Sequence, residues 1–220
     1  MPGSPERPVG ERPLSLVMTA KPLAHAKSRL GVDEAGRARW ARDMLAHVVD
    51  TALGAASVGG VVVVTADPDL ADLVAHRTGV TVLRTATDPG LRPSLATGRD
   101  VARRRTPGAP VGLLVTDLPL LRAEDLDAVA VQLPAAPAAA AGLFVADHLG
   151  TGTTMLLHRA GAASPILFGD DSAAAHARAG YVPATGELTG LRQDLDDAED
   201  LRTVESGRVR ADGSGISRDG

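Results

Sequence analysis

The chain has no cysteine and few aromatic residues among its 220 amino acids, with two phenylalanines, one tyrosine and one tryptophan. Without cysteine, disulfides, thiolate metal sites, iron–sulfur clusters and cysteine nucleophiles are excluded. The first dozen residues, MPGSPERPVGER, are polar and lack the apolar segment of a secretory signal. Both features favour a cytoplasmic protein.

Long apolar runs and a basic excess are also lacking. No apolar run reaches the ~18–20 residues that a membrane span needs. The 23 basic and 27 acidic side chains give a formal net charge of −4, which disfavours a general nucleic-acid binder. A hydrophobic fraction of 44% is enough for a substantial core. We therefore expect a soluble protein without a membrane or nucleic-acid partner.

Apolar runs and helical patterns alternate along the first half of the chain. The run GVVVVTAD at 60–67 is typical of a strand covered on both faces. Strands are also predicted at 14–19, 80–84 and 111–116, and helices at 33–53, 68–77 and near 93–105. This order predicts an α/β fold with a doubly wound, mostly parallel sheet, whose ligands bind at the carboxyl ends of the strands.

The second half is less regular, and we interpret it as part of the same domain. The Ala/Pro-rich stretch 133–142 is followed closely by two strand candidates, LFVAD and TTMLLH. We therefore predict one domain over 14–205, with disordered tails at 1–13 and 206–220.

Lysine is rare, and its two occurrences, Lys21 and Lys27, lie in one loop with Arg29. A cationic loop after the first strand of such a sheet can lie beside the phosphates of a nucleotide. Neither G-x-x-x-x-G-K-[ST] nor a G-x-G-x-x-G after the first strand is present, so a P-loop or a standard dinucleotide fold is not supported. A solvated basic loop is an equally good interpretation.

Two acidic segments are candidates for a divalent metal site. Asp117 follows the buried run VGLLVT by one residue, and Asp194 and Asp196 alternate with Leu195, so their carboxylates share a side of an extended segment. Helix capping or turn formation explains any one of these residues equally well.

Two glycine-bearing loops are candidates for anion binding. GTGTT at 150–154 combines backbone N–H groups with hydroxyls, and FGDDS at 168–172 places Ser172 at the head of a predicted helix. Ordinary turns, with Ser172 as a helix cap, are the alternative.

Six local patterns occur together in the order and spacing of one enzyme family: KPLAHAKSRL, VVVVTADPDLADL, TDLPLL, GTGTT, FGDDSAAAH and GLRQDLDDAEDL. Over roughly residues 14–204 the chain resembles the phosphoenolpyruvate and 2-phospho-L-lactate guanylyltransferases of coenzyme F420 biosynthesis. The resemblance implies a nucleotidyltransferase fold of the glycosyltransferase-A-like type. It also implies GTP and phosphoenolpyruvate as substrates and Mg²⁺ as the cofactor.

The resemblance further implies roles for individual residues. The implied phosphoenolpyruvate contacts are Thr154, Gly169 and Ser172. The implied metal ligands are Asp117, Asp194 and Asp196, and the implied nucleotide contacts are Lys21, Lys27 and Arg29. Lys27 and Asp117 are the expected catalytic residues.

The chain departs from the family pattern at two places. Arg92 in LRPSL stands where the family often has asparagine, which leaves base recognition open, and His148 in DHLG matches no family position and is given no role. Alternatives are the same chemistry on 2-phospho-L-lactate or 3-phosphoglycerate, or a cytidylyl- or sugar-phosphate nucleotidyltransferase. A nucleotide-binding module without turnover is a third.

Overall fold

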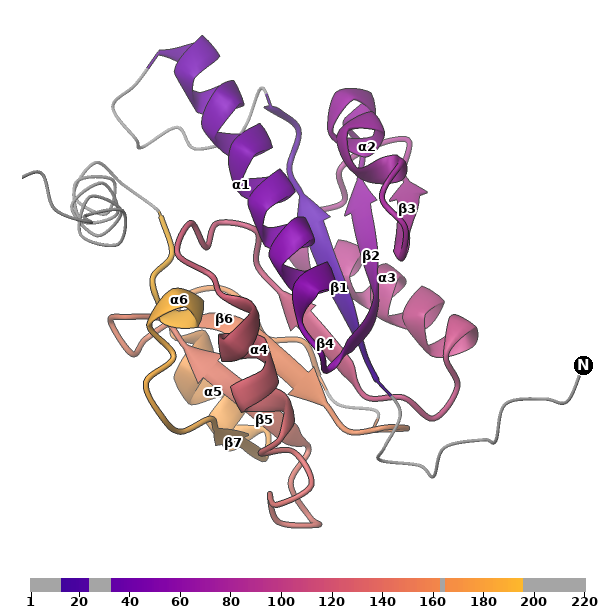
Figure 1. The fold of residues 1–220 in the computed structure, drawn as a ribbon. Coiled ribbons are helices and arrows are strands. Elements are labelled where there is room, and N and C mark those ends of the chain that lie inside the picture. The colour runs from indigo at the N-terminus through magenta and orange to yellow at the C-terminus, as the bar shows by residue number, and fades with distance from the viewer. Residues whose placement is uncertain (1–12, 24–32, 163–164, 196–220) are drawn as a thin grey trace, which may run out of the picture.

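A seven-stranded sheet runs through the computed structural model, which describes residues 13–23, 33–162 and 165–195 (Figure 1). The strands are β1 (Leu14–Ala20), β2 (Val58–Thr65), β3 (Val80–Arg84), β4 (Val111–Leu114), β5 (Gly142–Ala146), β6 (Thr153–His158) and β7 (Tyr181–Pro183). The helices are α1 (Glu34–Gly54), α2 (Pro68–Ala75), α3 (Leu91–Arg105), α4 (Ala123–Ala130), α5 (Ser172–Arg178) and α6 (Thr189–Arg192). The predicted α/β fold with a doubly wound, mostly parallel sheet is confirmed.

The strand order is β3-β2-β1-β4-β6-β5-β7, and β6 runs opposite to its neighbours. It pairs antiparallel with both β4 and β5, whereas β5 pairs parallel with β7. The start of β6 therefore lies at the same edge of the sheet as the carboxyl ends of β1, β4 and β5. Loops from both halves of the chain meet at that edge.

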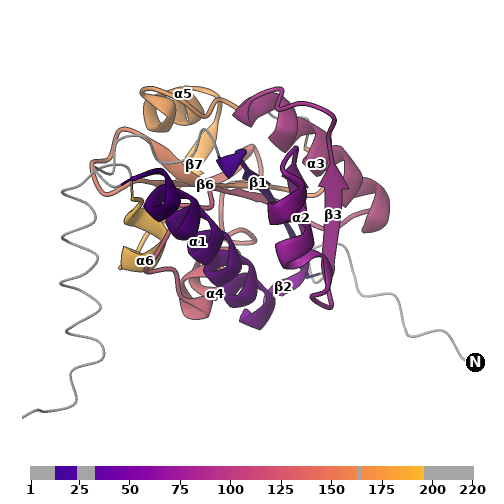
Figure 2. The ribbon, with the colours of Figure 1, turned by 90° about the horizontal axis from the view of Figure 1, so that it is seen from above.

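The sheet is buried on both faces. In β1, Leu16 and Met18 belong to one core and Val17 to the other, because successive side chains of a strand point to opposite faces. Figure 2 shows the sheet edge-on, with α3 and α5 on one side and α1, α4 and α6 on the other. Leu70 of α2 belongs to the same core as Leu45, Val48, Val49 and Ala52 of α1.

Helix α1 begins and ends within one residue of the predicted range 33–53. Asp33 caps it by accepting a 2.8 Å hydrogen bond from the N–H of Gly36. Its buried side chains are Met44, Leu45, Val48, Val49 and Ala52. Within the described ranges, no helix has both the length and the apolar character that crossing a bilayer requires.

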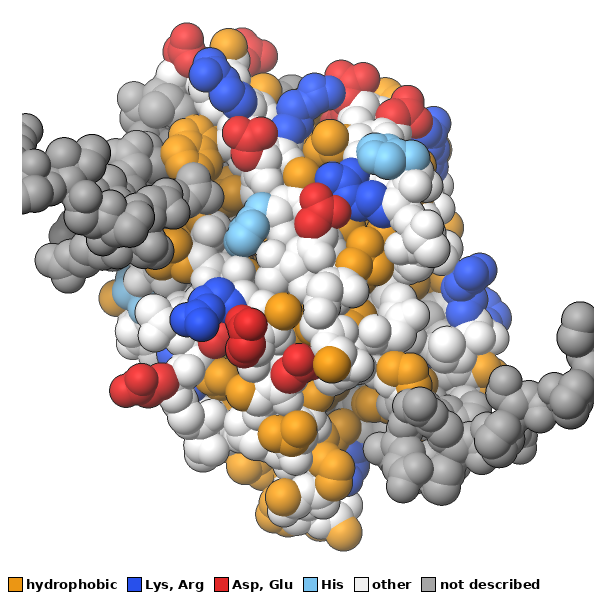
Figure 3. All heavy atoms as spheres, in the orientation of Figure 1, with side chains coloured by type: hydrophobic (Ala, Val, Ile, Leu, Met, Phe, Trp, Pro, Cys, Tyr) orange, Lys and Arg blue, Asp and Glu red, His pale blue; other side chains and the backbone are white. Residues whose placement is uncertain are grey.

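Positive and negative side chains are interspersed over α1 and α2 on the face seen in Figure 3. Ion pairs between Arg42 and Asp69, and between Arg77 and Asp50, join the two helices. Surface pairs such as Arg42–Asp69 contribute roughly 0–1 kcal/mol each. In the second pair the Arg77 side chain is mostly buried, and it lies just after the end of α2.

Two boundaries differ from the sequence prediction. Strand β4 ends at Leu114 although the apolar pattern continues to 116, so Asp117 lies three residues beyond the strand rather than one. The predicted tails at 1–13 and 206–220 fall outside the described residues apart from Pro13, and the single-domain boundary stays a prediction.

Candidate functional site

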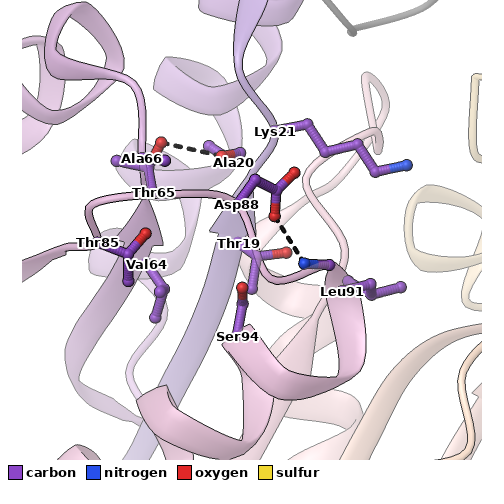
Figure 4. Close-up of a pocket in the computed structure, with 11 residues that line it drawn as sticks. Thr19, Ala20, Lys21, Val64, Thr65, Ala66, Thr85, Asp88, Leu91 and Ser94 are labelled. Carbon is purple, nitrogen blue, oxygen red and sulfur yellow. Dashed lines mark hydrogen bonds between the residues drawn. The ribbon is translucent and has the colours of Figure 1, made fainter.

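A pocket opens at the carboxyl ends of β1, β2 and β3, next to the start of α3 (Figure 4). It is lined by Thr19, Ala20, Lys21, Val64, Thr65, Ala66, Thr85, Asp88, Gly90, Leu91 and Ser94. Asp88 accepts a 2.9 Å hydrogen bond from the Gly90 N–H, which fixes the carboxylate at the entry to α3. Hydroxyls, one carboxylate and the exposed Lys21 give this pocket hydrogen-bond donors and acceptors for a polar ligand.

The segment that enters the basic loop is tied to the β2–α2 connection. Thr65 Oγ1 donates to the Ala20 carbonyl at 2.9 Å and accepts from the Asp67 N–H at 3.1 Å. Asp67 Oδ2 in turn accepts from the Leu23 N–H at 2.9 Å. Lys21 is thereby held at the pocket, while Lys27 and Arg29 lie outside the described residues.

The two acidic segments predicted to converge lie side by side. The Leu195 N–H donates to the backbone carbonyl of Asp117 at 2.9 Å. Leu195 is fully buried against Met44, with Trp40 packed on them, so the neighbouring Asp194 is directed away from that core. Asp196 lies outside the described residues.

His148, which sequence reasoning left without a role, contacts Asp194. Its Nδ1 lies 3.2 Å from Asp194 Oδ1. Within 13–23, 33–162 and 165–195, no three His, Cys, Asp or Glu side chains form a group that could hold a metal ion. Asp117 and Asp194 nevertheless supply the hard carboxylate oxygens that Mg²⁺ prefers, and they fit that ion as two of the three predicted ligands.

Thr154 is the extra residue of an irregularity in the β5–β6 pairing. Val145 pairs with Met155 but Ala146 pairs with Thr153, so the register shifts between the two pairs. Because of the shift, Thr153 faces α5 whereas Met155, two residues later, belongs to the core on the other face of the sheet. Bulges commonly redirect side chains in this way beside functional sites. Thr154 is buried, and its hydroxyl lies 3.4 Å from the Val145 carbonyl.

The backbone amides in the turn before β6 are already hydrogen-bonded within the turn. The N–H groups of Thr151 and Gly152 donate to the Asp147 carboxylate at 3.0 and 2.8 Å, and the Gly150 N–H donates to the Asp147 carbonyl at 3.1 Å. The expectation that the GTGTT loop offers these amides to an anion is therefore wrong for residues 150–152. Asp147 carries the negative charge that they bind.

The FGDDS loop leads directly into α5. Gly169 has φ 132°, a conformation that side-chain-bearing residues rarely adopt. The N-cap of α5 is Asp171 with φ 52°, and Ser172 is the buried first residue of the helix. By position the N-cap is Asp171, which makes no side-chain capping hydrogen bond, and the role of Ser172 stays a prediction.

Arg92 reaches from α3 to this loop. Its Nε donates to the Phe168 carbonyl, and a Cβ on Gly169 would lie 2.9 Å from the Arg92 guanidinium. Arg92 is not among the residues that line the pocket in Figure 4, although Leu91 and Ser94 are. The departure from the family's asparagine therefore falls beside the FGDDS loop rather than in the pocket.

Comparison with known proteins identifies the family. Residues 26–197 match the family described as the MobA-like NTP transferase domain. The phosphoenolpyruvate guanylyltransferase of Thermomonospora curvata is 41% identical over 193 residues, which cover 86% of this chain and 82% of that protein. The chain belongs to the phosphoenolpyruvate guanylyltransferase family. The member from Nocardia farcinica is 40% identical over 197 residues, covering 87% and 85% of the two chains.

Solved structures show the same fold in more distant nucleotidyltransferases. The crystal structure of 4-diphosphocytidyl-2C-methyl-D-erythritol synthase superposes with a TM-score of 0.60 at 15% identity, covering 89% of this chain and 98% of that one. At this identity the likeness concerns the fold alone. It confirms the nucleotidyltransferase type of fold that the resemblance implied.

The structure also brings forward three residues that the sequence patterns did not assign to the site: Asp88, His148 and Arg92. Asp88 could not be singled out as a pocket residue from the sequence, because a lone aspartate in TDPG is typical of an ordinary turn. The contacts of His148 and Arg92 join residues 46 and 76 positions apart. Such pairings are fixed by the tertiary fold and not by local spacing.

Proposed function

We propose that this nucleotidyltransferase joins the GMP moiety of GTP to phosphoenolpyruvate, giving enolpyruvyl-diphosphoguanosine and pyrophosphate in coenzyme F420 biosynthesis. The observation that carries the proposal is identity of about 40%, over most of the chain, to proteins named phosphoenolpyruvate guanylyltransferase. The meeting of the pocket, the acidic segments and the Gly169 loop at one edge of the sheet supports it. We assign the reaction to the cytoplasm.

In this reaction an oxygen of the phosphoenolpyruvate phosphate attacks the α-phosphorus of GTP. The bond from that phosphorus to the β-phosphate oxygen breaks, and pyrophosphate leaves with the electron pair. The attacking phosphate is already largely ionised near neutral pH, since its second pKa is near 6, so no general base is required. The main barrier is repulsion between two polyanions, and Lys21, Lys27 and Arg29 lower it by neutralising phosphate oxygens.

Asp117, Asp194 and Asp196 are the residues that would hold Mg²⁺. When bound, the ion neutralises phosphate oxygens and fixes their orientation for in-line displacement. The protein prepares this site by pinning the chain of Leu195 to the backbone of Asp117. This link between the two segments involves neither carboxylate.

Thr154, Gly169 and Ser172 are proposed to contact phosphoenolpyruvate. Thr154 and Ser172 are 1% exposed, so their hydroxyls are screened from bulk water. A hydrogen bond to an anion is stronger in such surroundings than in water. At Gly169 the absent side chain keeps space beside the Arg92 guanidinium. That cation is close enough to the loop to add attraction for an anionic acceptor.

The test is pyrophosphate release by the purified chain with Mg²⁺ and each of GTP, ATP, CTP and UTP. Each nucleotide is combined in turn with phosphoenolpyruvate, 2-phospho-L-lactate and 3-phosphoglycerate. We expect the fastest turnover with GTP and phosphoenolpyruvate. A preference for CTP would overturn the guanylyl assignment, and GTP binding without pyrophosphate release would overturn the enzymatic one.

A further inference from the structure

His176 of α5 is a fully buried histidine with two hydrogen-bond partners from distant parts of the chain. Its Nδ1 lies 2.9 Å from Thr153 Oγ1, and its Nε2 accepts a 3.0 Å hydrogen bond from the Leu167 N–H. The rings of Phe168 and Tyr181 meet it edge-on, with centroids 5.5 Å away in each case. The imidazole is therefore held in both position and plane.

The partners determine which nitrogen carries the proton. A backbone N–H can only donate, so Nε2 must present its lone pair to Leu167, and Nδ1 must carry the hydrogen that Thr153 accepts. Burial lowers the pKa of His176 to about 4, and the Arg92 cation acts in the same direction, against a hydrogen bond to the Ser172 backbone. The ring is thus neutral near pH 7, and a single tautomer satisfies both partners.

These contacts join the three segments that carry the proposed acceptor-binding residues. Thr153 precedes Thr154 on β6, and Leu167 lies two residues before Gly169. Ser172 lies one turn before His176 on α5, where positions i and i+4 share a face.

We propose that His176 is a positioning residue that sets the distances between Thr154, Gly169 and Ser172, and so governs recognition of the small phosphorylated acceptor. The proposal rests on the proposed function, since those three residues are acceptor contacts only if that function is right. His176 itself lies under the loop and acts through Thr153 and Leu167. Its loss should weaken the acceptor and leave the nucleotide unaffected.

His158 is a matched control in the same region. It is also fully buried, and its Nδ1 lies 3.0 Å from the Tyr181 hydroxyl. It hydrogen-bonds to none of the three acceptor segments, and within the described part of the chain its Nε2 has no hydrogen-bond partner. His158→Phe therefore removes a buried imidazole from the same core, and it reaches His176 only indirectly, through Tyr181.

The experiment measures the KM for phosphoenolpyruvate and for GTP in His176→Phe, which keeps the ring but neither hydrogen bond. We expect the acceptor KM to rise about tenfold or more, because small misplacements of positioning groups are costly, and the GTP KM to change less than twofold. Thr153→Val should give a similar rise, and the double variant should be no worse than either single one. His176→Gln, which offers one donor and one acceptor, should recover part of the loss.

Amide hydrogen exchange of the same variants without substrates separates this proposal from the proposed function. Faster exchange at Leu167 in His176→Phe, but not in His158→Phe, supports the positioning role even if wild type fails to use phosphoenolpyruvate. Unchanged exchange together with an unchanged acceptor KM overturns it. Equal rises in both KM values, or the same KM pattern in His158→Phe, also overturn it, because they indicate general damage to the core.

Discussion

The backbone N–H of Leu195 donates a 2.9 Å hydrogen bond to the backbone carbonyl of Asp117. This bond joins the loop after β4 to the segment after α6. The two bonded residues are 78 positions apart in the chain. It involves no side chain of either acidic segment. The backbone link therefore remains when the carboxylate of Asp117 or Asp194 is altered, although a change at Asp194 also removes its contact with His148.

Asp117→Asn should abolish most activity and leave the fold intact. Amide and carboxylate have nearly the same size, but the amide gives a weaker oxygen ligand without charge. We expect pyrophosphate release to fall at least ~100-fold, in line with the several kcal/mol that a bound cation supplies to phosphoryl transfer. The melting temperature, measured by calorimetry, should stay within about 2 °C of wild type. Turnover like that of wild type would remove Asp117 from the metal site.

Lys27→Ala should raise the KM for GTP more than that for phosphoenolpyruvate. An ammonium group beside a triphosphate attracts the negatively charged oxygens and so strengthens GTP binding. Its removal should raise the KM for GTP roughly tenfold, which corresponds to about 1.4 kcal/mol. Steady-state kinetics with each substrate varied in turn gives both values. Lys21→Ala is the comparison, because Lys21 lines the described pocket. An effect confined to the acceptor would reverse the assignment.

Arg92→Asn, which restores the residue common in the family, tests where this arginine acts. Its guanidinium bonds to the Phe168 carbonyl beside Gly169, so its loss should raise the acceptor KM several-fold and barely change the choice of base. The measurement is the ratio of kcat/KM for GTP and CTP, together with the acceptor KM. A shifted nucleotide preference with an unchanged acceptor KM would place Arg92 in base recognition instead.

Stability should fall as the pH drops below about 6.5. Burial lowers the pKa of His158 to about 3 and that of His176 to about 4, from an ordinary value of 6.5. Between these limits the unfolded chain binds more protons than the folded one, so the free energy of unfolding decreases with falling pH. Above about pH 6.5 the two neutral histidines contribute fully to the free energy of unfolding. This contribution is lost as the pH falls toward 4 for His176 and toward 3 for His158.

Urea denaturation between pH 5 and 7 measures this slope before most carboxylates titrate. Each histidine contributes at most about 1.4 kcal/mol per pH unit. His158→Phe and His176→Phe should each flatten the profile relative to wild type. A wild-type profile that is already flat over this range would mean that the two rings are not buried in the neutral form.

The sequence predicted the first half of the sheet well because its signals are local. The run VVVV in β2 is buried on both faces, and the start of α1 is marked by its cap Asp33. The antiparallel direction of β6 was not predictable, since TTMLLH has the same apolar character whichever way it pairs. The closed turn around Asp147 was missed for a related reason. Glycine and threonine signal a turn, but only the register of β5 and β6 decides which amides that turn consumes.

The candidate site shows the same limit. The alternation around Leu195 predicts that Asp194 and Asp196 lie on one side of the segment. Leu195 is buried, but Asp196 lies outside the described residues, so the shared side stays a prediction. Thr153 and His176 are 23 residues apart, and neither carries a motif that points to the other. Contacts of this kind require the strand order and the bulge at Thr154, and those arise from packing over the whole sheet.

Because β6 begins at the edge where β1, β4 and β5 end, the residues proposed to bind the acceptor fall within one continuous stretch, from Asp147 through His176. Under the proposed function, exchanging this stretch between relatives would change the acceptor preference and leave the pocket at β1, β2 and β3 as it is. Arg92 lies outside the stretch but hydrogen-bonds to the Phe168 carbonyl, so it would have to be exchanged together with it.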